Sequence, residues 1–210
     1  MDDDALFDAL ARQRGRVAAL LDDLDHDEWD VASWCEGWQV RHVVGHMVSL
    51  IEVPMRRFFF GSIRHRGFDR CASRLAVEWG SQSRPNLRAA YRATVDVAKA
   101  PPYAGPIAPL VDVVVHTVDI TGPLGREPDL DPEAAEQVLA YLTGDKTASF
   151  LPSVRAEGLR FVASDLDREF GSGARLEGPA GPLVAALSQR RAALDHLRGE
   201  GVDELARRIG

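Results

Sequence analysis

Hydrophobic and polar positions follow a helical period over most of the first two thirds of the chain. Apolar side chains recur three and four positions apart, which places them on one face of a helix. Pro54 falls inside one of these patterns and is expected to kink the helix or to end a segment of it. The pattern predicts four amphipathic helices, over residues 3–24, 40–60, 86–100 and 107–124.

The clearest helix of the chain is predicted over residues 131–144. Asp131 is a suitable N-cap, Pro132 stands at the first helical position, and Gly144 stands just past the end. Residues 61–84, by contrast, are basic and show no clear period. We interpret them as a solvated loop, with an anion-binding surface near a pocket mouth as the alternative.

The pattern changes after residue 144. Residues 159–164 alternate as a strand does, residues 171–179 form a short strand between turns, and residues 181–197 and 202–209 return to helix. We therefore place a domain boundary near residues 147–158. The predicted fold class is α+β, with a helical bundle in residues 1–150 and a small α/β domain in residues 151–210.

Composition narrows the functional classes. The chain has 210 residues, 45% of them hydrophobic and 27% charged, with a net charge of −7, so nucleic acid is not an expected partner. The spacing of Cys35 and Cys71 is not that of a zinc ribbon, and two cysteines in 210 residues are not typical of a disulfide scaffold. We therefore expect the protein in a reducing cytoplasm. The N-terminus lacks the features of a signal peptide, and no run approaches about 18 apolar residues, so no membrane partner is expected.

The candidate chemistry lies in the run 107–124, where Asp112 and His116 stand four apart. The valines between them favour a strand when taken alone, but the run is too long for one. On a helix, both side chains share a face and form half of a metal site, with His46 as the candidate third ligand. The alternative is a structural Asp–His pair, because two residues at this spacing are a weak motif.

Other features near these residues allow two interpretations each. Trp29, Trp34 and Trp38 predict a packed lid over the end of the bundle, with a stacking platform for a ligand as the alternative. Arginines on the second helix are candidates to bind an anionic substrate, although solvated arginines are commoner. These arginines are Arg41, Arg56 and Arg57.

Three stretches together resemble a known family. SWCEGWQVRHVVGHM resembles the C-x-G-W-x-V-R-x-V-V-x-H signature of the mycothiol-dependent maleylpyruvate isomerase-like family, within the DinB-like superfamily. DVVVHTVDITGPLGREP is similar to the second motif of that family. LRFVASDLDREFGSG and the residues after it are similar to its C-terminal domain. The resemblance spans nearly the whole chain.

The resemblance implies a DinB-like four-helix bundle that binds one divalent metal, usually read as zinc. By position, the implied ligands are His46, Asp112 and His116, although the family has Glu where this chain has Asp112. The shorter side chain requires a closer backbone or a bridging water. The residue at His42 is commonly Asp in the family, and we interpret His42 as a rim residue or a support for a ligand.

The implied function is a metal-dependent enzyme that uses mycothiol as its thiol cofactor. The activated thiol would serve isomerisation or thiol transfer on a small-molecule substrate. The alternatives are a thiol S-transferase or detoxification enzyme, and a non-enzymatic protein that binds a metal or small molecule. The expected assembly is a monomer or a homodimer in the cytoplasm.

Overall fold

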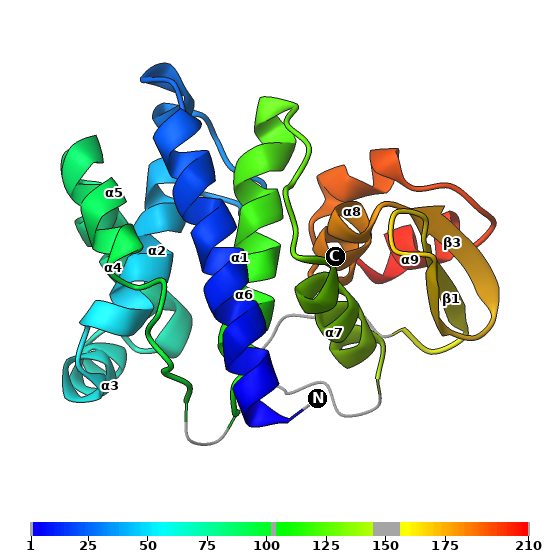
Figure 1. The fold of residues 1–210 in the computed structure, drawn as a ribbon, viewed down its shortest axis with the longest axis horizontal. Coiled ribbons are helices and arrows are strands. Elements are labelled where there is room, and N and C mark those ends of the chain that lie inside the picture. Colours follow the sequence, from blue (N-terminus) through cyan, green and yellow to red (C-terminus); the bar gives the residue numbers. More distant parts are fainter. Residues whose placement is uncertain (1, 102–103, 145–155, 210) are drawn as a thin grey trace.

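The computed structural model describes residues 2–101, 104–144 and 156–209 (Figure 1). These residues form a mostly helical α+β fold with one small sheet near the C-terminus. The helices are α1 (Asp3–Asp23), α2 (Val40–Glu52), α3 (Met55–Arg64), α4 (Phe68–Gly80), α5 (Arg84–Arg92), α6 (Ile107–Thr121), α7 (Pro132–Thr143), α8 (Ala180–Leu187) and α9 (Val202–Arg208).

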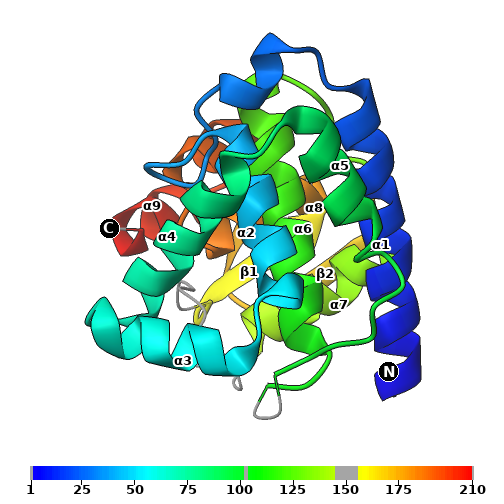
Figure 2. The same cartoon turned by 90° about the vertical axis from the view of Figure 1, so that its left-hand side faces the viewer.

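The bundle is built around α6, which packs against α1, α2, α7 and α8. Figures 1 and 2 show α1, α2 and α6 side by side, and α5 closes the bundle against α1 and α2. By length and composition, Ile107–Leu124 is apolar enough to cross a membrane, but 67% of this 18-residue window is buried inside the protein. It is therefore the central helix of the bundle, which explains its run of buried valines.

Helix α4 lies directly against α2, and glycine permits this close approach. A Cβ atom on Gly45 would lie 2.4 Å from the carbonyl oxygen of Ala76 and 2.5 Å from the amide nitrogen of Gly80. No side chain fits there without separating the two helices. Helix α3 in turn packs on α4, with the Phe58 and Phe68 rings 4.5 Å apart.

The sheet has three strands, β1 (Leu159–Ala163), β2 (Arg168–Gly171) and β3 (Ala174–Gly178), in the order β2-β1-β3. β1 pairs antiparallel with β2 and parallel with β3, so that Phe161 stands opposite Phe170 and Leu176. Helix α8 is buried along its whole length and contacts α6, α7 and the sheet. The C-terminal elements thus share a continuous core with the bundle.

Several predicted elements are confirmed. Helix α1 ends at Asp23, the run at 107–124 is helical, and the predicted strand at 159–164 is β1. Asp131 caps α7 by accepting a hydrogen bond from the amide of Ala134, with Pro132 at the first helical position. Pro54 ends α2 and stands at the N-cap of α3.

Two predictions between Gly61 and Ala100 are wrong. Residues 61–84 are not a loop, because α4 occupies most of them and buries a stripe of small residues that the arginines obscured in the sequence. The helix predicted over 86–100 ends at Arg92. Beyond it, Arg14 binds the carbonyl oxygens of Thr94 and Val97, which favours turns in place of further helix.

The C-terminal part differs in detail from the prediction. The helix predicted over 181–197 ends at Leu187, and Gln189 follows with a φ of 68°, before a short 3₁₀ helix at Arg191–His196. Strand β2 was not predicted. Most of the proposed boundary at 147–158 lies outside the described residues, so the division into residues 1–150 and 151–210 stays a prediction.

Candidate metal centre

Three side chains from α2 and α6 converge inside the bundle. His46 comes from α2, and Asp112 and His116 come from α6, one turn apart on the face turned to α2. One potential ligand atom of each residue lies within 4.8 Å of the other two. The arrangement follows from sequence spacing on α6 and from the direct packing of α2 against α6 (Figure 2).

The distances between these atoms fit a single small cation. Asp112 Oδ1 lies 3.3 Å from His46 Nε2 and 3.5 Å from His116 Nε2. Ligands about 2.0–2.1 Å from a tetrahedral zinc ion stand about 3.3–3.4 Å apart. The Asp112 carboxylate therefore reaches both imidazoles directly, and the shorter side chain at this position does not prevent the geometry.

A second carboxylate, Asp119, holds the ring of His116. Its Oδ2 atom lies 2.9 Å from His116 Nδ1, and Arg190 donates to both of its oxygens, at 2.9 Å from Nε and 2.7 Å from Nη2. Asp119 is fully buried. Since an ionised carboxylate only accepts hydrogen bonds, His116 donates its Nδ1–H to Asp119, and its Nε2 atom faces Asp112.

The charges around the site favour ionised carboxylates. Burial by itself raises the pKa of Asp112, but His116, His46 and the guanidinium of Arg14 outweigh it and hold this pKa below its ordinary value. Burial likewise opposes ionisation of Asp119, and the hydrogen bonds from His116 and Arg190 lower its pKa overall. Both groups are therefore anionic at neutral pH and suited to bind cations.

Trp38 and Cys35 complete the surroundings. The Trp38 ring lies 5.0 Å from the His46 ring and 6.1 Å from the His116 ring, centroid to centroid, so it packs against both imidazoles. The pKa of the Cys35 thiol is raised to about 11, chiefly by burial and then by the negative charge of Asp119. His46 Nδ1 is buried and has no hydrogen-bond partner among the described residues, so this ring is oriented by packing and by the contact of its Nε2 atom with Asp112.

Comparisons with known proteins agree with this architecture. Residues 10–53 match the family model described as the mycothiol maleylpyruvate isomerase N-terminal domain. This segment contains His46 and the whole of α2. In this segment the chain is similar to the N-terminal domain of that isomerase family.

Solved structures extend the agreement in fold to nearly the whole isomerase. The crystal structure of the mycothiol-dependent maleylpyruvate isomerase and that of one of its histidine-to-alanine mutants each superpose with a TM-score of 0.63. Each alignment covers 95% of this chain and 93% of the isomerase at 14% sequence identity. No curated protein matches the sequence of the chain. The isomerase fold is thus retained although few residues are identical.

Other residues considered for the isomerase-like site lie elsewhere. His42 Nδ1 accepts a hydrogen bond from the amide of Gln39 at 3.2 Å, so it caps α2 and is not a ligand. Arg41 donates to Asp30 and to two carbonyl oxygens, which occupies its guanidinium. Trp29 is fully buried, with Arg88 over its ring, and has a packing role.

Sequence reasoning missed Asp119 and Arg190. Asp119 stands three residues after His116, a spacing that places both on one helical face, so this signal was present in the sequence. Arg190 is 71 positions from its partner and had no local signal. Its contact exists only because α8 packs against α6.

Proposed function

We propose that the chain is a metal-dependent enzyme that activates a low-molecular-weight thiol for isomerisation or thiol transfer. Its metal would be zinc, held by His46, Asp112 and His116, and its thiol cofactor would be mycothiol. The observation that carries the proposal is the convergence of Asp112 Oδ1 with the two Nε2 atoms at separations typical of tetrahedral ligands.

The donor set fits a catalytic metal better than a purely structural one. Three protein ligands leave a fourth position for an exogenous molecule, whereas structural zinc sites are closed by four protein ligands. A divalent metal at this position lowers the pKa of a thiol that binds to it, which makes the thiolate available at neutral pH.

The residues around the site have distinct roles in this proposal. Asp119 keeps His116 in one tautomer, and Arg190 neutralises Asp119, so that the ligand nitrogen stays oriented without a net buried charge. Trp38 covers the two imidazoles and limits the access of water to them. Both effects orient the ligands before any substrate binds.

The cysteines of the chain do not supply the nucleophile. Cys71 is buried in the packing between α3 and α4, and the raised pKa of Cys35 leaves little thiolate at neutral pH. A thiol used at this site therefore comes from a separate molecule, in agreement with mycothiol as cofactor. Since both cysteines are free, we place the protein in a reducing cytoplasm.

A thiol nucleophile supports two related reactions. Reversible addition to a conjugated double bond allows rotation and then elimination, which is cis–trans isomerisation. Attack on a different electrophile, without elimination of the thiol, is thiol transfer. The substrate in either case is a small molecule.

The experiment combines metal content with turnover. Purified wild type, Asp112→Ala and His116→Ala are analysed for zinc, and each is assayed with maleylpyruvate and with a panel of electrophiles, with and without mycothiol. We expect about one zinc per wild-type chain, loss of zinc in both variants, and thiol-dependent turnover in the wild type alone. Asp129→Ala, which removes an exposed carboxylate that is not part of the site, is the control and should retain both properties.

The results distinguish the alternatives. Turnover of maleylpyruvate identifies an isomerase, and conjugation of electrophiles identifies a transferase. Zinc binding without any thiol-dependent turnover would indicate a non-enzymatic metal-binding protein. Wild-type protein without zinc, together with destabilised variants, would show that Asp112 and His116 form a structural pair and would refute the proposal.

A further inference from the structure

Helices α3 and α4 carry an exposed apolar patch. Among the described residues, the large hydrophobic side chains that are exposed all lie within residues 55–77, and the most exposed of them is 67% accessible. Isolated exposed hydrophobic residues are ordinary, but their concentration in one segment indicates an interaction surface. The members of this patch are Met55, Phe59, Phe60, Ile63, Phe68 and Val77.

Helix α3 does not belong to the core. It contains no buried residue, and it packs on α4 at the end of the molecule opposite the sheet (Figure 1). Met55, Phe59 and Ile63 follow one another at intervals of four and form a stripe along the outer side of the helix. In an ordinary surface helix the apolar stripe faces the core, whereas in α3 it faces solvent. This apolar face can therefore be buried only by a binding partner.

The same segment is strongly basic. Residues 55–74 contain six arginines and one acidic residue, a net charge of +5, whereas the whole chain carries −7. The other residues therefore carry −12 together. A positive surface on an otherwise acidic protein attracts anions at one face only and orients the protein towards them.

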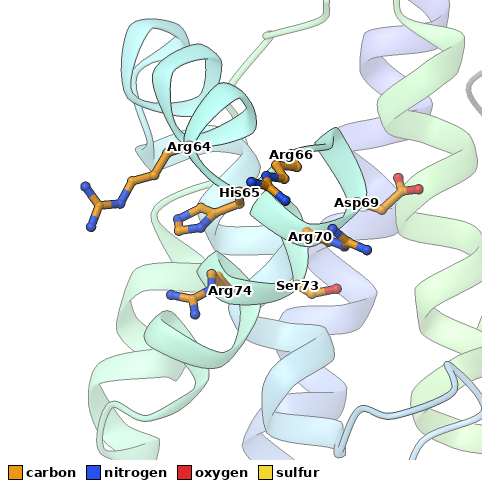
Figure 3. A pocket seen from close by; sticks show the side chains of 7 residues that line it. All are labelled: Arg64, His65, Arg66, Asp69, Arg70, Ser73 and Arg74. Atoms are coloured by element: carbon orange, nitrogen blue, oxygen red, sulfur yellow. The ribbon is translucent and has the colours of Figure 1, made fainter.

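Four of these six arginines line a hollow of about 520 Å³ at the junction of α3 and α4 (Figure 3). Arg64 is the last residue of α3, Arg66 lies between α3 and α4, and Arg70 and Arg74 come from α4. None of these four forms an ion pair with any residue that the structure describes. An adjoining groove is lined by Phe60 and Val77 as well as by Arg64 and Arg74, so apolar and cationic side chains share one surface.

We propose that α3 and α4 form a membrane-binding face that associates peripherally with anionic phospholipid bilayers. The arginines would bind lipid phosphates, and the apolar stripe of α3 would enter the boundary between headgroups and acyl chains. The prediction of no membrane partner rested on the absence of a run of about 18 apolar residues, which concerns spanning segments only. The exposed stripe of α3 became visible only with the structure.

A second copy of the chain fits this face less well. In a dimer with two-fold symmetry the same patch faces itself, so six arginines of one copy would meet six of the other. An anionic bilayer satisfies both the positive charge and the apolar stripe. The proposal is independent of the enzymatic function, since α3 contributes no residue to the candidate metal centre.

The test is sedimentation of the full-length protein with vesicles. The vesicles contain equimolar phosphatidylglycerol and phosphatidylcholine, and vesicles of phosphatidylcholine alone serve as the neutral comparison. One variant, Phe59→Ser with Phe60→Ser, removes apolar contacts. Another removes three free cations through the substitutions Arg64→Gln, Arg70→Gln and Arg74→Gln.

A matched control keeps the net charge equal to that of the cationic variant. It carries Arg92→Gln, Arg168→Gln and Arg198→Gln, which remove three arginines that are exposed outside the patch. All variants should unfold at nearly the wild-type temperature, because none of the substituted side chains is buried. A loss of binding can then be assigned to the surface and not to unfolding.

We expect the wild type and the matched control to bind anionic vesicles and to bind neutral ones weakly. The cationic variant should lose about 100-fold in affinity, and the apolar variant at least about tenfold. Binding of the wild type should weaken with added salt. Absence of wild-type binding, or equal binding by all variants, would overturn the proposal. The proposal would also be overturned if the patch mediated dimerisation or the binding of an acidic protein while the wild type did not bind vesicles.

Discussion

Substitution of Asp119 separates the support of His116 from the general stability of the fold. Asp119 is fully buried and accepts from His116 and from Arg190, whose side chain is only 13% exposed. Asp119→Ala would leave the guanidinium without its counter-ion, at a cost of about 3–5 kcal/mol. Because a loss of that size can approach the whole stability of a domain, Asp119→Asn is the more useful variant.

Asp119→Asn keeps the shape of the side chain but has one acceptor oxygen for three donor N–H groups, one from His116 and two from Arg190. We expect its free energy of unfolding, measured with urea in the presence of chelator, to fall by about 1–3 kcal/mol. Zinc affinity should fall about 10- to 100-fold, because the tautomer of His116 is no longer fixed. The two measurements use the same protein, without and with metal.

Asp129→Asn is the matched control, because Asp129 also pairs with an arginine but is 71% exposed. Asp129→Asn should lower the free energy of unfolding by no more than about 1 kcal/mol and leave the zinc affinity unchanged. If Asp119→Asn matched this control in both stability and zinc affinity, the assignment of Asp119 as the residue that positions His116 would be wrong.

Three further predictions address packing, pH dependence and thiol reactivity. Gly45→Ala should lower stability by about 1–3 kcal/mol in thermal unfolding, since its Cβ would meet the carbonyl oxygen of Ala76 at 2.4 Å; an unchanged melting temperature would contradict this packing. Burial raises the pKa of Asp131, but the hydrogen bonds from Arg12 and from the Ala134 amide lower it by more, so the folded pKa lies below the ordinary value. The contribution of Asp131 to stability is therefore complete above the unfolded pKa of about 3.9 and is lost as the pH falls through the folded pKa. The stability difference between wild type and Asp131→Asn should therefore shrink between about pH 5 and pH 3, and a constant difference would refute this ion pair. Cys35, with a pKa of about 11, should react with iodoacetamide at pH 8 on the order of tenfold more slowly than free cysteine, and equal rates would contradict its burial.

The sequence was sufficient where local patterns decide the structure. The cap and proline of α7 and the alternation of β1 are properties of a few neighbouring residues, and both elements are present. The pairing of Asp112 with His116 likewise follows from spacing on one helix. The approach of His46 depends on how α2 packs, and it was anticipated from the family motif and not from spacing.

Long-range packing decided the features that the sequence did not reveal. Helix α4 was hidden because its buried face is made of small residues such as Ala72 and Ala76, between exposed arginines. The shortened α5 reflects hydrogen bonds from Arg14, which is 80 positions away from Thr94. The pair of Asp119 and Arg190 depends in the same way on the docking of α8, which no local pattern predicts.

The metal centre is tested most directly by a crystal structure of zinc-loaded protein with anomalous data collected on both sides of the zinc edge. The account predicts one anomalous peak about 2.0–2.2 Å from His46 Nε2, Asp112 Oδ1 and His116 Nε2. Crystals of the His116→Ala variant, measured in the same way, should show no anomalous peak at this position. A wild-type structure in which the zinc lies elsewhere, or in which no zinc is bound while the three side chains keep their hydrogen bonds, would contradict the account.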